Sequence, residues 1–111
     1  MSESRILSPD EQKLLGNLGL CARAGKLIFG VPMICDALRS KGGDALLVLE
    51  AQDTSENTHK RISDKTKTYG ARHVRLPIDG GTLASAVGKT SYLGAVAVTD
   101  PGMCGLIEKY L

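Results

Sequence analysis

The segment from Arg23 to Pro32 carries the residues best suited to holding an anion. It reads Arg-Ala-Gly-Lys-Leu-Ile-Phe-Gly-Val-Pro, which places two cations and two glycines ahead of a predicted helix. The free amides and the positive dipole end of a helix N-terminus attract anions, and glycine lets a phosphate chain approach the backbone. A capped loop between two helices explains the same residues, so both interpretations stay open here.

A second candidate anion surface is a basic cluster between His59 and Arg75. Asp64 is the one acidic residue opposing it, so the segment has an excess of five positive charges. The whole chain has 14 basic and 12 acidic residues, a net charge of +2, which excludes a uniformly basic nucleic-acid binder. A solvated helix face is the alternative explanation. The basic residues of the cluster are Lys60, Arg61, Lys65, Lys67, Arg72 and Arg75.

Two short patterns suggest an enzyme, and each lacks a required part. The run 88–90, Gly-Lys-Thr, resembles the end of a phosphate-binding P-loop, but Leu83 stands where that loop needs a glycine. Asp53, Ser55 and His59 could suggest nucleophilic catalysis, but no oxyanion donor or orienting acid is evident, and Ser55 suits a helix cap. We therefore expect no enzymatic activity.

The cysteines and histidines predict no metal site and no cofactor. Cys21, Cys35 and Cys104 are widely spaced, and His59 and His73 are the two histidines, whereas a zinc site needs four clustered ligands. Free cysteines are typical of a reducing cytosol. The sequence starts with no signal-peptide pattern, and no stretch approaches the roughly 20 apolar residues of a membrane span. We expect a cytoplasmic protein with no membrane partner.

The 111 residues alternate between predicted helices and strands along their whole length. This predicts one domain over 1–111, with 1–7 as a flexible tail, built as a three-layer α/β/α sandwich. The alternation taken alone favours a largely parallel sheet. The predicted helices begin near Pro9, Pro32, Glu56, Gly80 and Pro101, and the predicted strands cover 27–29, 45–49, 73–76 and 94–99.

Five pieces of the sequence, in order, resemble the bacterial YlxQ-type proteins, which are similar to the ribosomal L-seven-Ae and L-thirty-e proteins. The resemblance covers about residues 12–110. It implies an α/β/α sandwich with a small mixed sheet that binds kink-turn or related structured RNA. The matching pieces are Arg23–Leu27 with Gly30, Ala37–Ser40, Leu47–Thr58, Ala86–Lys89 and Val96–Val98.

The resemblance also implies where RNA is held. In that family the N-terminus of the second helix enters the RNA groove, and Gly30 matches the glycine that opens this helix. An apolar loop of the family packs on an extruded base, and Ala95, Val96 and Ala97 match that loop in character.

Three positions depart from the family pattern, which has an Asn and a Glu that read base edges and a Lys that meets phosphate. Here these positions hold Pro32, Met33 and Asp36. Pro32 has no amide hydrogen, Met33 can pack on a base but cannot read its edge, and Asp36 repels phosphate. General RNA contact is therefore expected, and base-edge reading is not.

We predict a non-catalytic RNA-binding protein that contacts kink-turn-like or ribosomal RNA, with the ribosome or translation factors as further partners and no DNA. The alternative is a protein-interaction or regulatory module on the same fold. With four aromatic residues in the chain, RNA binding would rest on phosphates, helix amides and shape. The predicted RNA-binding residues are Arg23, Gly25, Lys26, Gly30, Val31, Pro32, Met33, Lys41, Lys60, Ala95, Val96 and Ala97.

Overall fold

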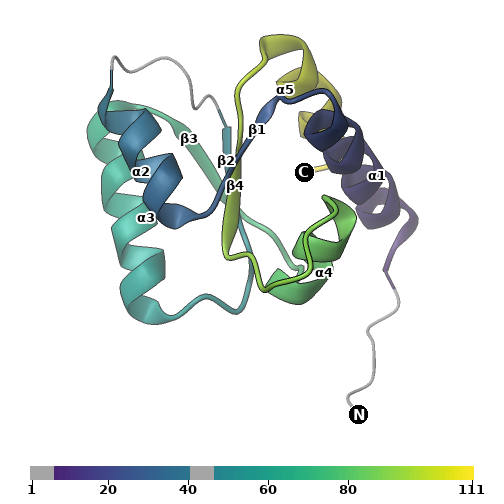
Figure 1. The fold of residues 1–111 in the computed structure, drawn as a ribbon, viewed down its shortest axis with the longest axis horizontal. Helices are drawn as coiled ribbons and strands as arrows, with labels where there is room; N and C mark the ends of the chain where they lie inside the picture. The colour runs from purple at the N-terminus through teal and green to yellow at the C-terminus, as the bar shows by residue number, and fades with distance from the viewer. Residues whose placement is uncertain (1–6, 41–46) are drawn as a thin grey trace.

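A computed structural model describes residues 7–40 and 47–111 and shows helices packed on both faces of a central sheet (Figure 1). The strand order is β1-β4-β2-β3. In chain order the elements are α1 (Pro9–Arg23), β1 (Leu27–Phe29), α2 (Val31–Arg39), β2 (Leu47–Glu50), α3 (Glu56–Tyr69), β3 (Arg72–Arg75), α4 (Gly80–Ala86), β4 (Ala95–Val98) and α5 (Pro101–Glu108).

The sheet is mixed, so the resemblance predicts it correctly and the expectation of a largely parallel sheet is wrong. β4 runs antiparallel to both β1 and β2, and β2 with β3 is the one parallel pair among the described strands. The 14 residues of α3 can carry the chain back along the sheet for a parallel strand. Helix α4 has seven residues and spans only about 10 Å, and β4 starts at the end of the sheet where β3 ends and runs the opposite way.

The three-layer arrangement is confirmed. Helices α2 and α3 cover one face of the sheet, and α1, α4 and α5 cover the other (Figure 1). Every residue of β4 is buried: Val96 and Val98 face the α1 side, and Ala95 and Ala97 face the α2 side. The small alanine side chains leave room for α2 to pack close to the sheet. No helix in the described ranges is long and apolar enough to cross a bilayer.

Most element boundaries agree with the sequence. Ser8 accepts a hydrogen bond from the Glu11 amide at 3.1 Å and donates its own amide to the Glu11 carboxylate at 2.9 Å, so the predicted cap of α1 forms. Helix α3 ends before Gly70, whose φ is 72°, as predicted. The strand predicted over 73–76 is β3, which covers Arg72–Arg75 and so lies one residue earlier. Leu7 packs against the core, whereas the rest of the predicted tail lies outside the described residues.

Helix α2 begins without a side-chain cap. Its first turn follows directly from β1 through Gly30, which has φ 87° and ψ 147° and donates its amide to the Ala95 carbonyl at 3.1 Å. These dihedral angles are open almost exclusively to glycine. The other four helices of the described part carry side-chain caps, which are Ser8, Ser55, Asp79 and Asp100.

The conformation of Gly30 predicts the effect of adding one methyl group. We expect Gly30→Ala to lower the free energy of unfolding by about 1–3 kcal/mol through backbone strain, since no atom blocks the new side chain at close range. The matched control is Gly16→Ala, at an exposed helical position with open space around it, which should raise stability by about 0.5–1 kcal/mol. Urea denaturation of both variants measures the two values, and equal effects would contradict the assigned geometry.

Candidate functional site

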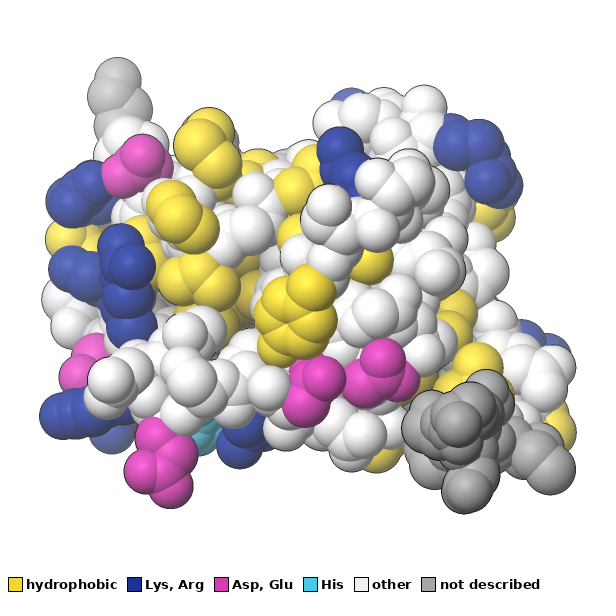
Figure 2. Space-filling model, turned by 60° about the horizontal axis from the view of Figure 1, so that its bottom comes forward, with side chains coloured by type: hydrophobic (Ala, Val, Ile, Leu, Met, Phe, Trp, Pro, Cys, Tyr) yellow, Lys and Arg dark blue, Asp and Glu magenta, His cyan; other side chains and the backbone are white. Residues whose placement is uncertain are grey.

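Three chain segments meet where β4 begins, and backbone hydrogen bonds hold them there. The Gly30 amide donates to the Ala95 carbonyl at 3.1 Å, and the Ala51 amide donates to the Gly94 carbonyl at 2.8 Å. The start of α2, the turn before α3 and the loop 88–94 therefore share one end of the molecule. Figure 2 brings this end forward and shows hydrophobic side chains in its middle, with Lys and Arg side chains on both sides.

A hollow of about 490 Å³ lies between these three segments. Its walls combine the apolar start of α2, one aromatic side chain and the polar residues of the turn before α3. Pro32 contributes no amide hydrogen to it, and no acidic side chain lies in the first turn of α2. Residues lining the hollow include Val31, Pro32, Asp53, Thr54, Tyr92 and Gly94.

Tyr92 is fixed in place although 55% of it is exposed. Its hydroxyl donates to Asp53 Oδ1 at 3.1 Å, and the same oxygen accepts the Gly80 amide at 2.9 Å. The ring lies so close to Gly80 that a Cβ there would be 2.2 Å from ring atom Cε1. Burial of the hydroxyl raises the pKa of Tyr92, and the hydrogen bond to Asp53 raises it further. The contacts with Asp53 and Gly80 therefore hold the exposed ring in one position.

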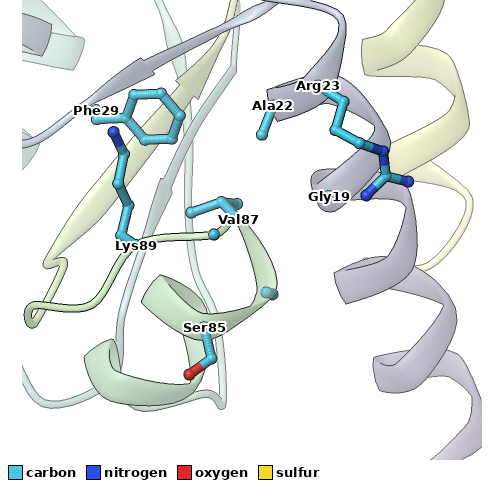
Figure 3. Close-up of a pocket in the computed structure, with 9 residues that line it drawn as sticks. Gly19, Ala22, Arg23, Phe29, Ser85, Val87 and Lys89 are labelled. Carbon is cyan, nitrogen blue, oxygen red and sulfur yellow. The ribbon is translucent and has the colours of Figure 1, made fainter.

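A second hollow of about 480 Å³ lies between α1, the end of β1 and the segment that follows α4 (Figure 3). Phe29 and Lys89 lie on one side of it, with Lys89 Nζ 4.3 Å from the centre of the Phe29 ring, and Arg23 lies on the α1 side. A smaller hollow shares Phe29 and Lys89 with the second hollow and Gly30 and Tyr92 with the first. We call the surface from the start of α2 across the loop 88–94 to Arg23 the Gly30 face.

Four of the predicted site residues line the hollows of this face, namely Arg23, Gly30, Val31 and Pro32. Met33 lies in the first turn of α2 and is 59% exposed.

Gly25 and Lys26 lie at the other end of β1. The Lys26 carbonyl accepts the Thr99 amide at 3.0 Å, beyond the C-terminal end of β4, whereas Gly30 pairs at its start. Strand geometry separates Lys26 from Gly30 by about 13 Å. The expectation of one compact anion-binding bend from Arg23 to Pro32 is therefore wrong, because a strand divides the segment into two ends.

The apolar loop predicted at Ala95, Val96 and Ala97 is also wrong. These residues form the buried strand β4 with 0% exposure, because their short side chains fill both faces of the sheet. Their side chains have no surface to offer an RNA base. The exposed loop is the preceding segment, 88–94, which carries Lys89 and Tyr92.

Several cations of the basic cluster have acidic neighbours in the folded protein and are therefore less available to bind an anion than the sequence suggests. Lys60 is 75% exposed and lies 3.9 Å from Asp64, and Arg72 forms an ion pair with Glu108. The third pair joins Arg75 Nε to Glu50 Oε2 at 3.7 Å. Half of the six cations thus have acidic neighbours. Lys41, also predicted to bind RNA, falls outside the described residues.

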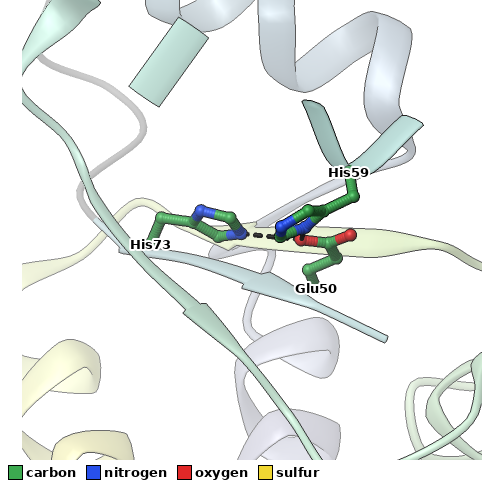
Figure 4. A group of neighbouring side chains, drawn as sticks. All are labelled: Glu50, His59 and His73. Carbon is green, nitrogen blue, oxygen red and sulfur yellow. Dashed lines mark hydrogen bonds and ion pairs between the residues drawn. The ribbon is translucent and has the colours of Figure 1, made fainter. Parts of the chain in front are cut away.

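Glu50, His59 and His73 form a group that the sequence reasoning missed (Figure 4). Glu50 is fully buried, and its Oε1 lies 2.8 Å from both His59 Nδ1 and His73 Nε2. Burial acts to raise the pKa of Glu50, but hydrogen bonds from Thr54 and the two histidines outweigh it and hold that pKa below its ordinary value. The sequence analysis looked for four clustered zinc ligands and did not consider a group of three such as this one, whose ligand atoms lie within 4.8 Å of one another.

Comparison with known proteins identifies the family, although no family model matches the chain. The RNA-binding protein YlxQ of Bacillus subtilis is 34% identical over 94 residues, which cover 85% of this chain and 90% of that protein. The chain belongs to the YlxQ family. The RNA-binding protein YlxQ of Enterococcus faecium is 40% identical over 60 residues, 54% of this chain and 56% of that protein's length.

Two solved structures share the fold of this YlxQ-family chain. A Bacillus halodurans protein of unknown function superposes with a TM-score of 0.75 and 28% identity, covering 86% of this chain and 97% of its own. The Giardia lamblia 15.5kD RNA binding protein also gives a TM-score of 0.75, at 12% identity, covering 95% of this chain and 87% of its own. The second likeness shows the fold alone.

Sequence reasoning missed Tyr92 and Lys89 as members of the Gly30 face in this YlxQ-family chain. Lys89 drew notice as part of a P-loop-like run and as the last residue of one family-matching piece, and Tyr92 only as one of four scattered aromatic residues. The polar, glycine-bounded run between α4 and the apolar strand was the available signal of an exposed loop.

The hydrogen bond between Tyr92 and Asp53 predicts a shifted phenol titration. Tyr92 should lose its proton above the ordinary value near 10, and Asp53→Asn should bring that titration down, because the variant removes the negative charge. Ultraviolet absorbance of the phenolate measures this, with Tyr92→Phe identifying the Tyr92 contribution. A titration that Asp53→Asn leaves unchanged would contradict the contact.

Proposed function

We propose that this YlxQ-family chain is a non-catalytic RNA-binding protein that contacts structured RNA through the Gly30 face. Its relatives in Bacillus subtilis and Enterococcus faecium are both named RNA-binding proteins. The observation that carries the proposal is the meeting of an uncapped helix start with the platform of Tyr92 and the cation of Lys89 on one surface.

The start of α2 supplies the phosphate contact. No side chain occupies its first turn as a cap, and the positive end of the helix dipole favours an anion there. Pro32 removes one amide donor, so Lys89 adjoining the same surface supplies the missing attraction. Asp53 lies on the opposite wall, already occupied by Tyr92 and Gly80, so phosphate is favoured on the Lys89 side.

The ring of Tyr92 supplies the base contact. Its position is fixed by Asp53 and Gly80 while more than half of it is exposed, so a base displaced from an RNA helix can stack on it without a cost for ordering the ring. Val31 and Pro32 extend the apolar surface beside the ring. Stacking of this kind contributes about 1–3 kcal/mol per base.

We extend the proposal to RNA that presents a displaced base beside a bent backbone, as kink-turn or ribosomal RNA does, and to a cytoplasmic location with ribosomal or translation-factor partners. The family resemblance and the three free cysteines support this extension. At the start of α2, Pro32 and Met33 would contact such an RNA through their apolar surface and their shape. Asp36, one turn along α2, forms an ion pair with Arg39, which weakens its repulsion of phosphate.

The binding surface is tested by comparing the two ends of β1. Tyr92→Ala should weaken RNA binding by roughly 5- to 100-fold, and Lys89→Glu should weaken it across sequences and lower the salt slope by about one. Lys26→Glu makes the same change of charge at the other end of β1 and should weaken RNA binding less than Lys89→Glu does. Tyr92→Phe keeps the stacking ring and should bind nearly as wild type. Fluorescence anisotropy over a salt series measures the affinity and the salt slope of each variant. A larger effect from Lys26→Glu than from Lys89→Glu would show that RNA binds at the Lys26 end of β1 and would contradict the proposal.

The kind of RNA is tested with two oligonucleotides of equal length. One carries an internal loop that bends two helices, and the other pairs the same helices throughout. We expect at least about tenfold tighter binding to the bent RNA, because only it offers a displaced base. Equal affinities would reduce the proposal to general phosphate binding. Absence of RNA binding at physiological salt would favour a protein partner, for which the exposed Met33 and Tyr92 side chains are also suited.

A further inference from the structure

The group formed by Glu50, His59 and His73 has its own chemistry, although it lies next to the surface proposed to bind RNA, since Thr54 both lines the first hollow and donates to Glu50. Three elements bring it together: Glu50 ends β2, His59 lies in the first turns of α3, and His73 lies in β3 beside Val48. Both imidazole rings reach the same carboxylate oxygen, and their centres are 5.8 Å apart (Figure 4).

The two oxygens of Glu50 have different environments. Oε2 accepts a hydrogen bond from the Thr54 hydroxyl and lies 3.7 Å from Arg75 Nε, so this end of the carboxylate is held by the protein. Oε1 faces only the two histidines among the described residues. A carboxylate held by one oxygen presents the other as a single, oriented ligand atom.

We propose that Glu50, His59 and His73 bind one divalent transition-metal ion of the zinc class. Glu50 Oε1, His59 Nδ1 and His73 Nε2 all lie within 4.8 Å of one another. Ligand atoms around a tetrahedral zinc ion, each about 2.1 Å from it, are about 3.4 Å apart. The two 2.8 Å contacts must therefore open by roughly half an ångström, and the two ring nitrogens, which are at most 4.8 Å apart, must come closer together. Side-chain rotation supplies both shifts.

The ligand types select the class of ion. Two imidazoles and one carboxylate suit Zn²⁺, Co²⁺ or Ni²⁺, whereas Ca²⁺ and Mg²⁺ prefer oxygen ligands throughout. Three protein ligands leave the fourth position for water. His59 is 39% exposed and His73 15%, so an ion can reach the site from solvent although Glu50 itself is buried. The Arg75 cation opposes a dication, but it lies on the far oxygen of the carboxylate.

Metal uptake by the chelator-treated full chain tests the proposal. Calorimetric titration with Zn²⁺ should give one ion per chain, and Co²⁺ should give a tetrahedral visible spectrum without the near-ultraviolet band of thiolate ligands. His59→Gln and His73→Gln should each weaken Zn²⁺ binding at least tenfold, because an amide can keep a hydrogen bond to Glu50 but is a poor zinc ligand.

The matched control is Cys104→Ser, which removes a thiol that is not part of the group and should leave metal binding unchanged. Circular dichroism of the metal-free variants checks that each is folded. Absence of uptake by folded wild-type protein, uptake that both glutamine variants retain, or a cobalt–thiolate band would each overturn the proposal. RNA binding plays no part in these measurements, so their outcome is independent of the proposed function.

Discussion

The pairing at the start of β4 is the constraint on which the rest of the structure depends. There the backbone of the central strand bonds to the end of β1 through Gly30 and to the end of β2 through Ala51. Because both neighbouring strands are antiparallel to β4, their chain exits lie beside its entry. The segments that follow β1 and β2 and the loop that precedes β4 must therefore share one surface, whatever their sequences.

This placement decides which side chains serve packing and which remain available. Ala95, Val96 and Ala97 are buried in the sheet, and the exposed aromatic side chain of the region is Tyr92, three residues before the strand. Glycine at position 80 lets that ring lie against the backbone. Beside the same pairing, at the end of β2, the sheet buries the carboxylate of Glu50, and a buried charge persists only with partners. Its neighbours are two imidazoles, a hydroxyl and a guanidinium.

Local sequence signals predict most of the helices and strands. The serine caps, the glycine after Tyr69 and the apolar run of β4 locate the elements to within a residue or two, because each is a property of neighbouring residues. The direction of β4, which is antiparallel to both of its neighbours, does not follow from the alternation of helix and strand. The resemblance to the YlxQ-type proteins supplied that information.

The candidate sites were harder to predict, since they are formed by residues far apart in sequence. Glu50 and His73 are 23 positions apart and meet only through the register of β2 with β3. Lys26 and Gly30 are close in sequence, yet an intervening strand places them at opposite ends of the sheet. Spacing along the chain predicts proximity within a helix or a turn, and it misleads across a strand.

Amide chemical shifts of the isotope-labelled protein, titrated with a bent, structured RNA, test directly whether RNA meets the Gly30 face. We expect the largest changes at Val31, Met33 and the segment 88–94, with small changes at Gly25 and Lys26. Changes concentrated at the turn between α1 and β1, or no changes at physiological salt, would contradict this placement.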